Sequence, residues 1–96
     1  MNTLIALRNI RQEILAIAAR HGAHNVRLFG SVARGDDTTD SDVDILVSME
    51  SGRSLYDLIC FQQEIENLLG RHTDVLTENG INRHLKNKIL GEATPL

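Results

Sequence analysis

The stretch FGSVARGDDTTDSDVDILV, residues 29–47, places two acidic side chains in a segment that otherwise has the composition of a buried strand. Residues 42–48 alternate and are rich in branched side chains, which predicts a β-strand. Side chains two positions apart in a strand point to the same face, so Asp42 and Asp44 are expected to project together from one side of a sheet. The opposite side of the strand is expected to face helices; it carries Val43, Ile45 and Val47.

Outward from this stretch, the apolar spacing predicts a single α/β domain over residues 1–96. Residues 2–20 have helical spacing, and Gly22 follows as a left-handed cap. The other predicted elements are strands at 25–29 and 72–77 and helices at about 32–35, 55–69 and 81–90. Ser54 and Asp57 form a predicted capping box at the start of the helix at 55–69, and Asn79-Gly80 is a predicted turn. No repeat or linker interrupts the chain.

The composition excludes several classes of function. A net charge of −3 argues against non-specific nucleic-acid binding, and an aromatic content of 3% leaves few faces for base stacking. The lone Cys60 cannot form an internal disulfide, which suits a reducing compartment. Without a signal peptide or an apolar run of about 20 residues, the chain is expected to be soluble and cytoplasmic, away from membranes.

A third carboxylate is expected to join the pair on the sheet. Asp74 lies in the third predicted strand, and its side chain reaches the same face if that strand lies beside the second in register. Neighbouring carboxylates repel one another and are costly to desolvate. A divalent cation removes this cost, and Mg²⁺ prefers such oxygen ligands while keeping positions open for water and phosphates. The acids therefore predict a magnesium site.

Gly30-Ser31 supplies a complementary feature at a predicted strand-to-helix turn. Glycine allows close approach of the backbone, and the free N–H groups at the start of a helix favour anionic oxygens. The hydroxyl of Ser31 adds one more donor. A phosphate cradle followed ten residues later by metal-binding carboxylates indicates a nucleoside triphosphate site.

Gly30-Ser31 is followed, after ten residues, by Asp42-Val43-Asp44, and Asp74 lies on the next predicted strand. This pattern resembles the signature of the DNA polymerase beta nucleotidyltransferase superfamily. Within it, the string GSVARGDDTTDSDVDILV resembles the minimal nucleotidyltransferases, and most closely the MntA-type antitoxins. The resemblance covers essentially the whole chain. It implies the nucleotidyltransferase fold, an α/β (α+β) architecture whose small mixed sheet has about three to four strands flanked by helices.

The resemblance also implies roles for individual residues. Asp42 and Asp44 would bind one or two Mg²⁺ ions, and Asp74 would complete this set and act as general base. Gly30 and Ser31 would bind the β- and γ-phosphates of ATP. Arg34 would contribute a further phosphate contact. The implied activity is Mg-dependent transfer of AMP to a tyrosine of a HEPN ribonuclease toxin, which this antitoxin would neutralise as a hetero-oligomeric partner.

Simpler roles remain open for these and other polar residues. The three aspartates could be exposed strand positions, Ser31 could only cap the short helix, and Arg34 could pair with a neighbouring acid. Asp36, Asp37 and Asp40 are expected in a solvated loop, and Cys60 as a packed thiol. The four histidines have no zinc-ligand spacing and are expected to be structural or exposed; they are His21, His24, His72 and His84. The basic residues Arg83, Lys86 and Lys88 are expected on a solvated helix face.

Two other functions fit the same residues. A small-molecule nucleotidyltransferase, such as one that modifies an antibiotic, usually encloses its acceptor with an additional helical domain. A non-catalytic antitoxin would neutralise its toxin by binding alone, and such a protein has no need of three costly carboxylates on one face. Substitution of Asp42 and Asp44 separates this binder from an enzymatic antitoxin, because a binder would keep neutralising whereas an enzyme would stop.

Overall fold

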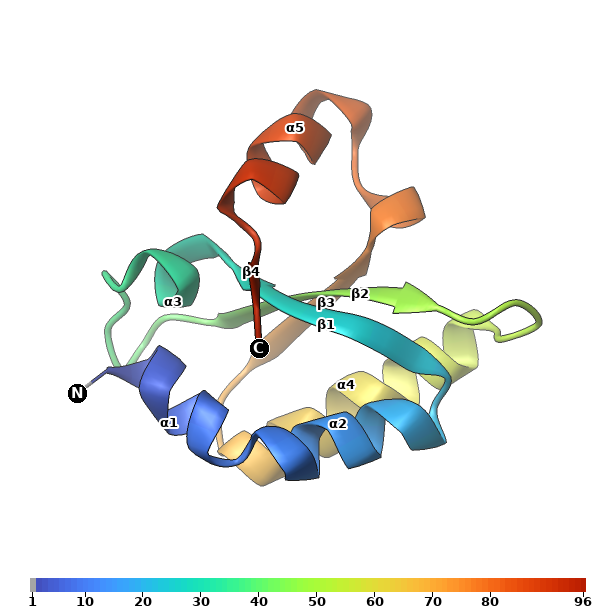
Figure 1. Cartoon of the computed structure of the whole chain (residues 1–96), viewed down its shortest axis with the longest axis horizontal. Helices are drawn as coiled ribbons and strands as arrows, with labels where there is room; N and C mark the ends of the chain where they lie inside the picture. Colours follow the sequence, from blue (N-terminus) through green and yellow to red (C-terminus); the bar gives the residue numbers. More distant parts are fainter. Residues whose placement is uncertain (1) are drawn as a thin grey trace.

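The computed structural model describes residues 2–96, which form a four-stranded mixed sheet with helices on both faces (Figure 1). The strands are β1 (Ala23–Phe29), β2 (Val43–Met49), β3 (Thr73–Thr77) and β4 (Thr94–Pro95), in the spatial order β3-β2-β1-β4. β1 is antiparallel to β2 and β4, whereas β2 and β3 are parallel. One face is covered by α1 (Thr3–Asn9), α2 (Arg11–Arg20) and α4 (Leu55–Leu69), and α5 (Arg83–Glu92) lies on the other. The predicted α/β class and mixed sheet are confirmed.

The N-terminal segment forms two helices instead of the single helix expected over residues 2–20. Ile10 separates α1 from α2 with φ −110° and ψ 23°, outside helical geometry. No glycine or proline marks this position, so the apolar periodicity continues through the break and hides it. Gly22 has φ 74° and its N–H donates to the carbonyl of Ala19 at 3.2 Å, which confirms the predicted left-handed cap.

The main core lies between the sheet and α1, α2 and α4. Val43, Ile45 and Val47 are at most 1% exposed there, as the alternation of β2 predicts. From α4, Phe61 and Ile65 are fully buried against this face. The central strand is therefore fixed in register, because a slip of one residue would turn its branched side chains out of the core.

The apolar side chains of α4 are not all buried. Leu55 and Ile59 are 70% and 47% exposed, although their spacing along the chain is also helical. The helix carries two rows of apolar side chains, and only the row around Phe61 and Ile65 faces the sheet. The start of α4 is as expected, since the Asp57 carboxylate accepts the N–H of Ser54 at 2.9 Å.

A smaller core lies on the opposite face of the sheet, under α5. Phe29 and Leu46 of the sheet pack there against Ile81 and Ile89. Leu85 of the same helix is 51% exposed. Leu46 lies two residues beyond Asp44 on β2, so this core attaches α5 to the sheet near Asp44, which stays partly exposed.

The remaining boundaries lie close to the predicted ones. β1 begins two residues before the expected 25–29, and α3 (Gly30–Arg34) begins at Gly30 instead of near residue 32. The predicted Asn79-Gly80 turn lies in the 3₁₀ turn η1 (Glu78–Gly80). β4 was not predicted, because two residues carry no periodicity. Within residues 2–96, no helix combines the length and apolar character needed to span a bilayer.

Candidate active site

The two aspartates of the DVD sequence lie where the chain enters β2. Asp42 immediately precedes the strand and is exposed, whereas Asp44, its second residue, is partly buried. Val43 between them is 0% exposed and belongs to the main core. Burial of Val43 therefore directs both acids to the face of the sheet that α5 partly covers.

Asp74 reaches the same face from the adjacent strand. β2 and β3 are parallel, and Asp44 is paired directly with Asp74 in their register. Thr73 and Val75, on either side of Asp74, are 0% and 6% exposed and fix the strand in this orientation. The register that the sequence left open is thus the one that gathers the acids.

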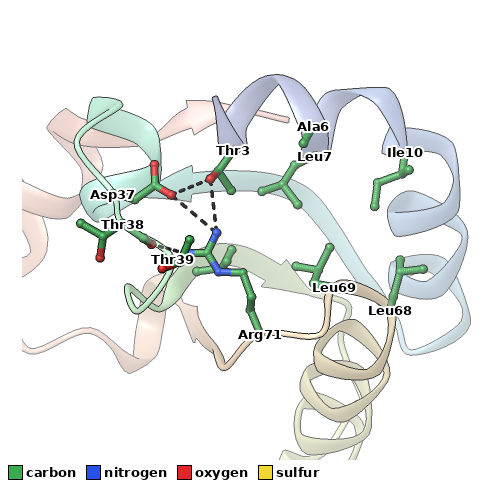
Figure 2. A pocket seen from close by; sticks show the side chains of 11 residues that line it. Thr3, Ala6, Leu7, Ile10, Asp37, Thr38, Thr39, Leu68, Leu69 and Arg71 are labelled. Atoms are coloured by element: carbon green, nitrogen blue, oxygen red, sulfur yellow. Dashed lines mark hydrogen bonds and ion pairs between the residues drawn. The ribbon is translucent and has the colours of Figure 1, made fainter. Parts of the chain in front are cut away.

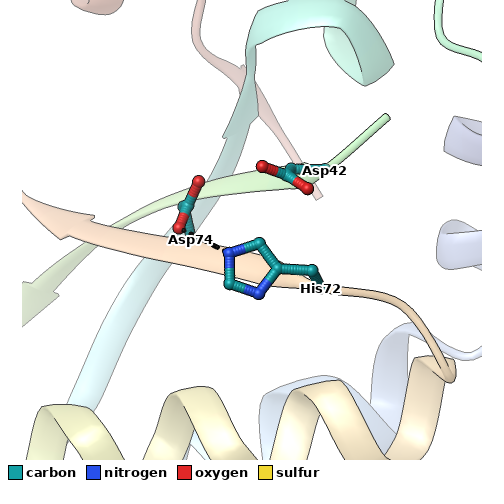
Figure 3. Close-up of side chains that lie close together, drawn as sticks. All are labelled: Asp42, His72 and Asp74. Carbon is teal, nitrogen blue, oxygen red and sulfur yellow. Dashed lines mark ion pairs between the residues drawn. The ribbon is translucent and has the colours of Figure 1, made fainter. Parts of the chain in front are cut away.

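His72 completes a cluster with two of the acids (Figure 3). One ligand atom from each of Asp42, His72 and Asp74 lies within 4.8 Å of the other two. The Nε2 atom of His72 is 3.2 Å from Oδ1 of Asp74, and its Nδ1 atom is 2.8 Å from Oε2 of Glu66. His72 is exposed, as expected, but its place beside Asp42 and Asp74 was not predicted. Its position two residues before Asp74 was the available signal, since that spacing gives a shared face.

Asp44 faces the same region, but its carboxylate lies against Gly30. Burial raises the pKa of Asp44, and the negative charges of Asp74 and Asp42 raise it further. The pKa of His72 is raised as well, mainly by its hydrogen bond with Glu66 and then by the charge of Asp42. The carboxylates thus repel one another and attract a positive group.

Gly30 lies directly above Asp44, where β1 turns into α3. Its φ is 70°, in the left-handed region that glycine adopts without strain. A Cβ atom at this position would overlap the carboxylate of Asp44, so glycine is required by space as well as by backbone conformation. The N–H of Gly30 donates to Oε2 of Glu92 at 3.3 Å. Ser31 follows in the first turn of α3 and is partly exposed.

Arg34 extends from the end of α3 and is half exposed. Its Nε is 3.2 Å from Asp36 and its Nη1 is 3.0 Å from Glu92. Asp36 and then Glu92 raise the pKa of Arg34. The alternative role of Arg34, pairing with a neighbouring acid, is therefore present with Asp36, and Arg34 also contacts Glu92.

Asp37 was expected in a solvated loop, but its side chain is buried and has a structural role. Its side chain is 7% exposed, accepts the hydroxyl of Thr3 at 2.5 Å and lies 3.5 Å from Nη1 of Arg71. These contacts tie the loop before β2 to α1 and to the start of β3. The hydrogen bond from Thr3, followed by the charge of Arg71, lowers the pKa of Asp37.

The same three residues close one side of a pocket of about 680 Å³ that is separate from the acidic cluster (Figure 2). Its other walls are mainly apolar and come from α1, β2 and the end of α4; they include Leu7, Ile10, Val43, Leu68 and Leu69. The polar side chains of Thr3, Asp37 and Arg71 bond to one another. The pocket is therefore a mainly apolar cavity with few unpaired polar side chains. The acidic face of the sheet remains the candidate active site.

The donor set on that face suits a hard divalent cation and a phosphate-bearing substrate. Carboxylate oxygens from neighbouring strands are the ligands that Mg²⁺ prefers, and an imidazole can also bind many divalent metals. The repulsion that raises the pKa of Asp44 is of the kind a cation relieves. Beside these oxygens, Gly30 presents a backbone N–H to a carboxylate, which shows that this amide can serve an anionic oxygen.

Comparison with known proteins identifies similar sequences along most of the chain. The profile of the family described as "Nucleotidyltransferase domain" matches residues 7–96. "Putative protein adenylyltransferase MJ0435" from Methanocaldococcus jannaschii is 42% identical over 91% of this chain and 94% of its own length. "Protein adenylyltransferase MntA" from Thermococcus cleftensis is 36% identical over 76% of this chain and 74% of its own length.

Two solved structures share the fold. One described as a "putative minimal nucleotidyltransferase" superposes with a TM-score of 0.87 at 46% identity, covering 100% of this chain and 97% of the other. A chain from a toxin–antitoxin crystal structure with AMP-PNP superposes with a TM-score of 0.75 at 17% identity, covering 88% and 69% of the two chains. The second similarity concerns the fold alone.

Proposed function

Because the chain belongs to the nucleotidyltransferase domain family, we propose that it transfers AMP from ATP to a hydroxyl group of a partner protein. The observation that carries the proposal is the pairing of Asp44 with Asp74 on parallel strands beside the Gly30 turn. This arrangement offers acids for a cation and a backbone amide for phosphates on one surface. The two relatives described as protein adenylyltransferases support a protein as the acceptor.

Asp42, Asp44 and Asp74 are the residues that would hold Mg²⁺. Bound Mg²⁺ would neutralise negative charge on the phosphate oxygens during the transfer. The N–H of Gly30, the hydroxyl of Ser31 and the guanidinium of Arg34 would hold the β- and γ-phosphates. An exposed arginine 3.0 Å from a carboxylate has the reach and charge for this contact.

In the proposed reaction, the acceptor oxygen attacks the α-phosphorus of ATP, and the bond from that phosphorus to the α,β-bridging oxygen breaks. Asp74 takes up the proton of the hydroxyl group, and pyrophosphate leaves. Gly30, Ser31 and Arg34 hold the leaving phosphates on the side opposite the acceptor, which keeps the displacement in line.

The proposed acceptor is a tyrosine of a HEPN-domain toxin, and its modification would neutralise the toxin. A neighbour in fold comes from a toxin–antitoxin structure that contains AMP-PNP, which places such a fold beside both a toxin system and a nucleotide analogue in that protein. The acidic cluster is exposed at Asp42 and His72, so a side chain from a second protein can approach it.

Co-expression with a HEPN toxin encoded beside this chain tests the proposal. The wild-type chain should restore growth, whereas Asp42→Asn/Asp44→Asn should fail although it still folds and still binds the toxin. A matched control, Asp40→Asn, changes an exposed acid that lies outside the cluster. Growth rescue by the double variant would overturn the enzymatic proposal and leave neutralisation by contact.

A further inference from the structure

Glu92, the last residue of α5, contacts two of the groups that are proposed to bind the phosphates. Its Oε2 atom accepts the N–H of Gly30 at 3.3 Å, and its Oε1 atom is 3.0 Å from Nη1 of Arg34. The two carboxylate oxygens therefore engage one donor from the turn and one from the end of α3. The side chain is 22% exposed, so it is largely enclosed by these groups.

The backbone of Glu92 is fixed on both sides. Before it, Ile89 packs in the core between α5 and the sheet. After it, the N–H of Ala93 donates to the carbonyl of Ile89 at 2.9 Å, and Thr94 pairs with Leu28 of β1. The backbone of Glu92 is thus anchored close to Gly30, and only rotation about its side-chain bonds would withdraw the carboxylate.

A carboxylate and a phosphate compete directly for such a site. Both are anions that accept hydrogen bonds from an amide and a guanidinium, and one N–H cannot serve both at full strength. Burial and the charges of Asp74 and Asp42 raise the pKa of Asp44 most; the charge of Glu92 also raises it, whereas the charge of Arg34 lowers it. With Glu92 in place, a triphosphate would meet an additional negative charge and two occupied donors.

We propose that Glu92 is a built-in competitor of the nucleotide: its carboxylate occupies Gly30 and Arg34, and ATP binds only when this side chain rotates away. Glu92 then sets the affinity for nucleotides with β- and γ-phosphates. The inference rests on the proposed function, because it takes Gly30 and Arg34 as the phosphate-binding groups. It adds a residue of α5, far along the chain from the GS and DVD sequences, to the determinants of nucleotide binding.

The test is calorimetric titration of AMP-PNP with Mg²⁺ into the wild-type chain and into Glu92→Gln. The variant keeps the side-chain length but removes the charge and should bind about threefold to tenfold more tightly, as expected for loss of a partly exposed ion pair and of like-charge repulsion. Titration of AMP, which lacks the β- and γ-phosphates, should give the same affinity for both proteins. The matched control Glu50→Gln also removes one charge, from an ion pair with Arg53 beyond the opposite end of β2, and should bind AMP-PNP like the wild type.

The outcomes separate the inference from the proposed function. If the wild-type chain binds AMP-PNP and Glu92→Gln binds it equally or more weakly, the inference is wrong and the nucleotide site stands. If neither protein binds AMP-PNP, the nucleotide site itself is wrong, and the inference fails with it. Binding by Glu92→Gln alone would support the inference in its strongest form. A thermal unfolding scan of each variant ensures that all are folded.

Discussion

Ionised Asp44 lowers the stability of the fold, although the proposed reaction requires it as a metal ligand. In the folded chain its pKa is raised by burial and by the charges of Asp74 and Asp42, so folding disfavours its ionised form. This cost is present at neutral pH, is relieved as the pH falls through the raised pKa of the folded chain, and is absent below the ordinary value of 3.8. A residue that destabilises the fold at the working pH is expected where function requires it.

Replacing Asp44 with asparagine should therefore stabilise the metal-free protein while abolishing transfer. We expect a rise in the unfolding temperature of about 2–4 °C at pH 7 in the presence of EDTA, corresponding to roughly 0.5 kcal/mol for a domain of this size. Mg²⁺ should stabilise the wild-type chain more than the variant, because the variant lacks one proposed ligand. Scanning calorimetry measures both effects. A lower unfolding temperature for the metal-free variant would contradict the electrostatic strain inferred at Asp44.

The residues of the site differ in how far the sequence predicts them. Asp42 and Asp44 follow from a local pattern, since alternation along one strand fixes their common face. Asp74 required the register of β2 and β3, a contact between distant segments that no local pattern contains. Glu92 depends on how α5 packs across the sheet, and its charge alone could not distinguish it from other surface acids.

Among the elements, the loop at residues 36–41 has the greatest influence on the site because it leads into Asp42. Asp37 fixes this loop through Thr3 of α1 and through Arg71 at the start of β3. Arg71 also donates to the carbonyl of Ser41 at 2.6 Å, directly before Asp42. The position of the first acid is thus determined by contacts among three separate segments.

Asp37→Asn should loosen this loop and lower the free energy of unfolding by about 1–2 kcal/mol at pH 7, since it weakens hydrogen bonds to a charged group. The pKa of Asp37 is lowered in the folded chain, so its stabilising contribution is present above the ordinary value of 3.8 and is lost as the pH falls through the folded value. The difference between variant and wild type should accordingly shrink in acid. Urea unfolding at pH 7 and at about pH 3 measures it.

Asp40→Asn, in the same loop but exposed, is the control and should change stability little. If Asp37→Asn were as stable as the wild type at pH 7, or if its deficit stayed constant into acid, the proposed anchoring of the loop would be incorrect.

The elements themselves were largely predictable because most begin or end at residues with a clear physical role. Gly22, Gly35 and Gly70 each have a positive φ at or just after a helix end. The break at Ile10 had no such marker, and β4 is too short to have a pattern. In α4 the two apolar rows gave competing faces, and only packing against the sheet selected the row with Phe61 and Ile65.

In the whole molecule, one sheet separates two tasks. The face toward α1, α2 and α4 carries the main core, while the other face carries the acids at one end of β2 and a small core under α5 further along. This division keeps the acidic end of the sheet open while α5 brings Glu92 beside it. The chain can therefore hold a nucleotide site at its surface, where a partner protein can supply the acceptor.

The most direct test of adenylyl transfer is the intact mass of the proposed partner, a HEPN-domain toxin, after incubation with this chain, ATP and Mg²⁺. We predict that the partner gains the mass of one or more AMP units, and that the gain is absent with EDTA or with Asp42→Asn/Asp44→Asn. An unchanged partner mass, with a stable complex and a silenced toxin, would contradict adenylyl transfer as the function of the acidic cluster.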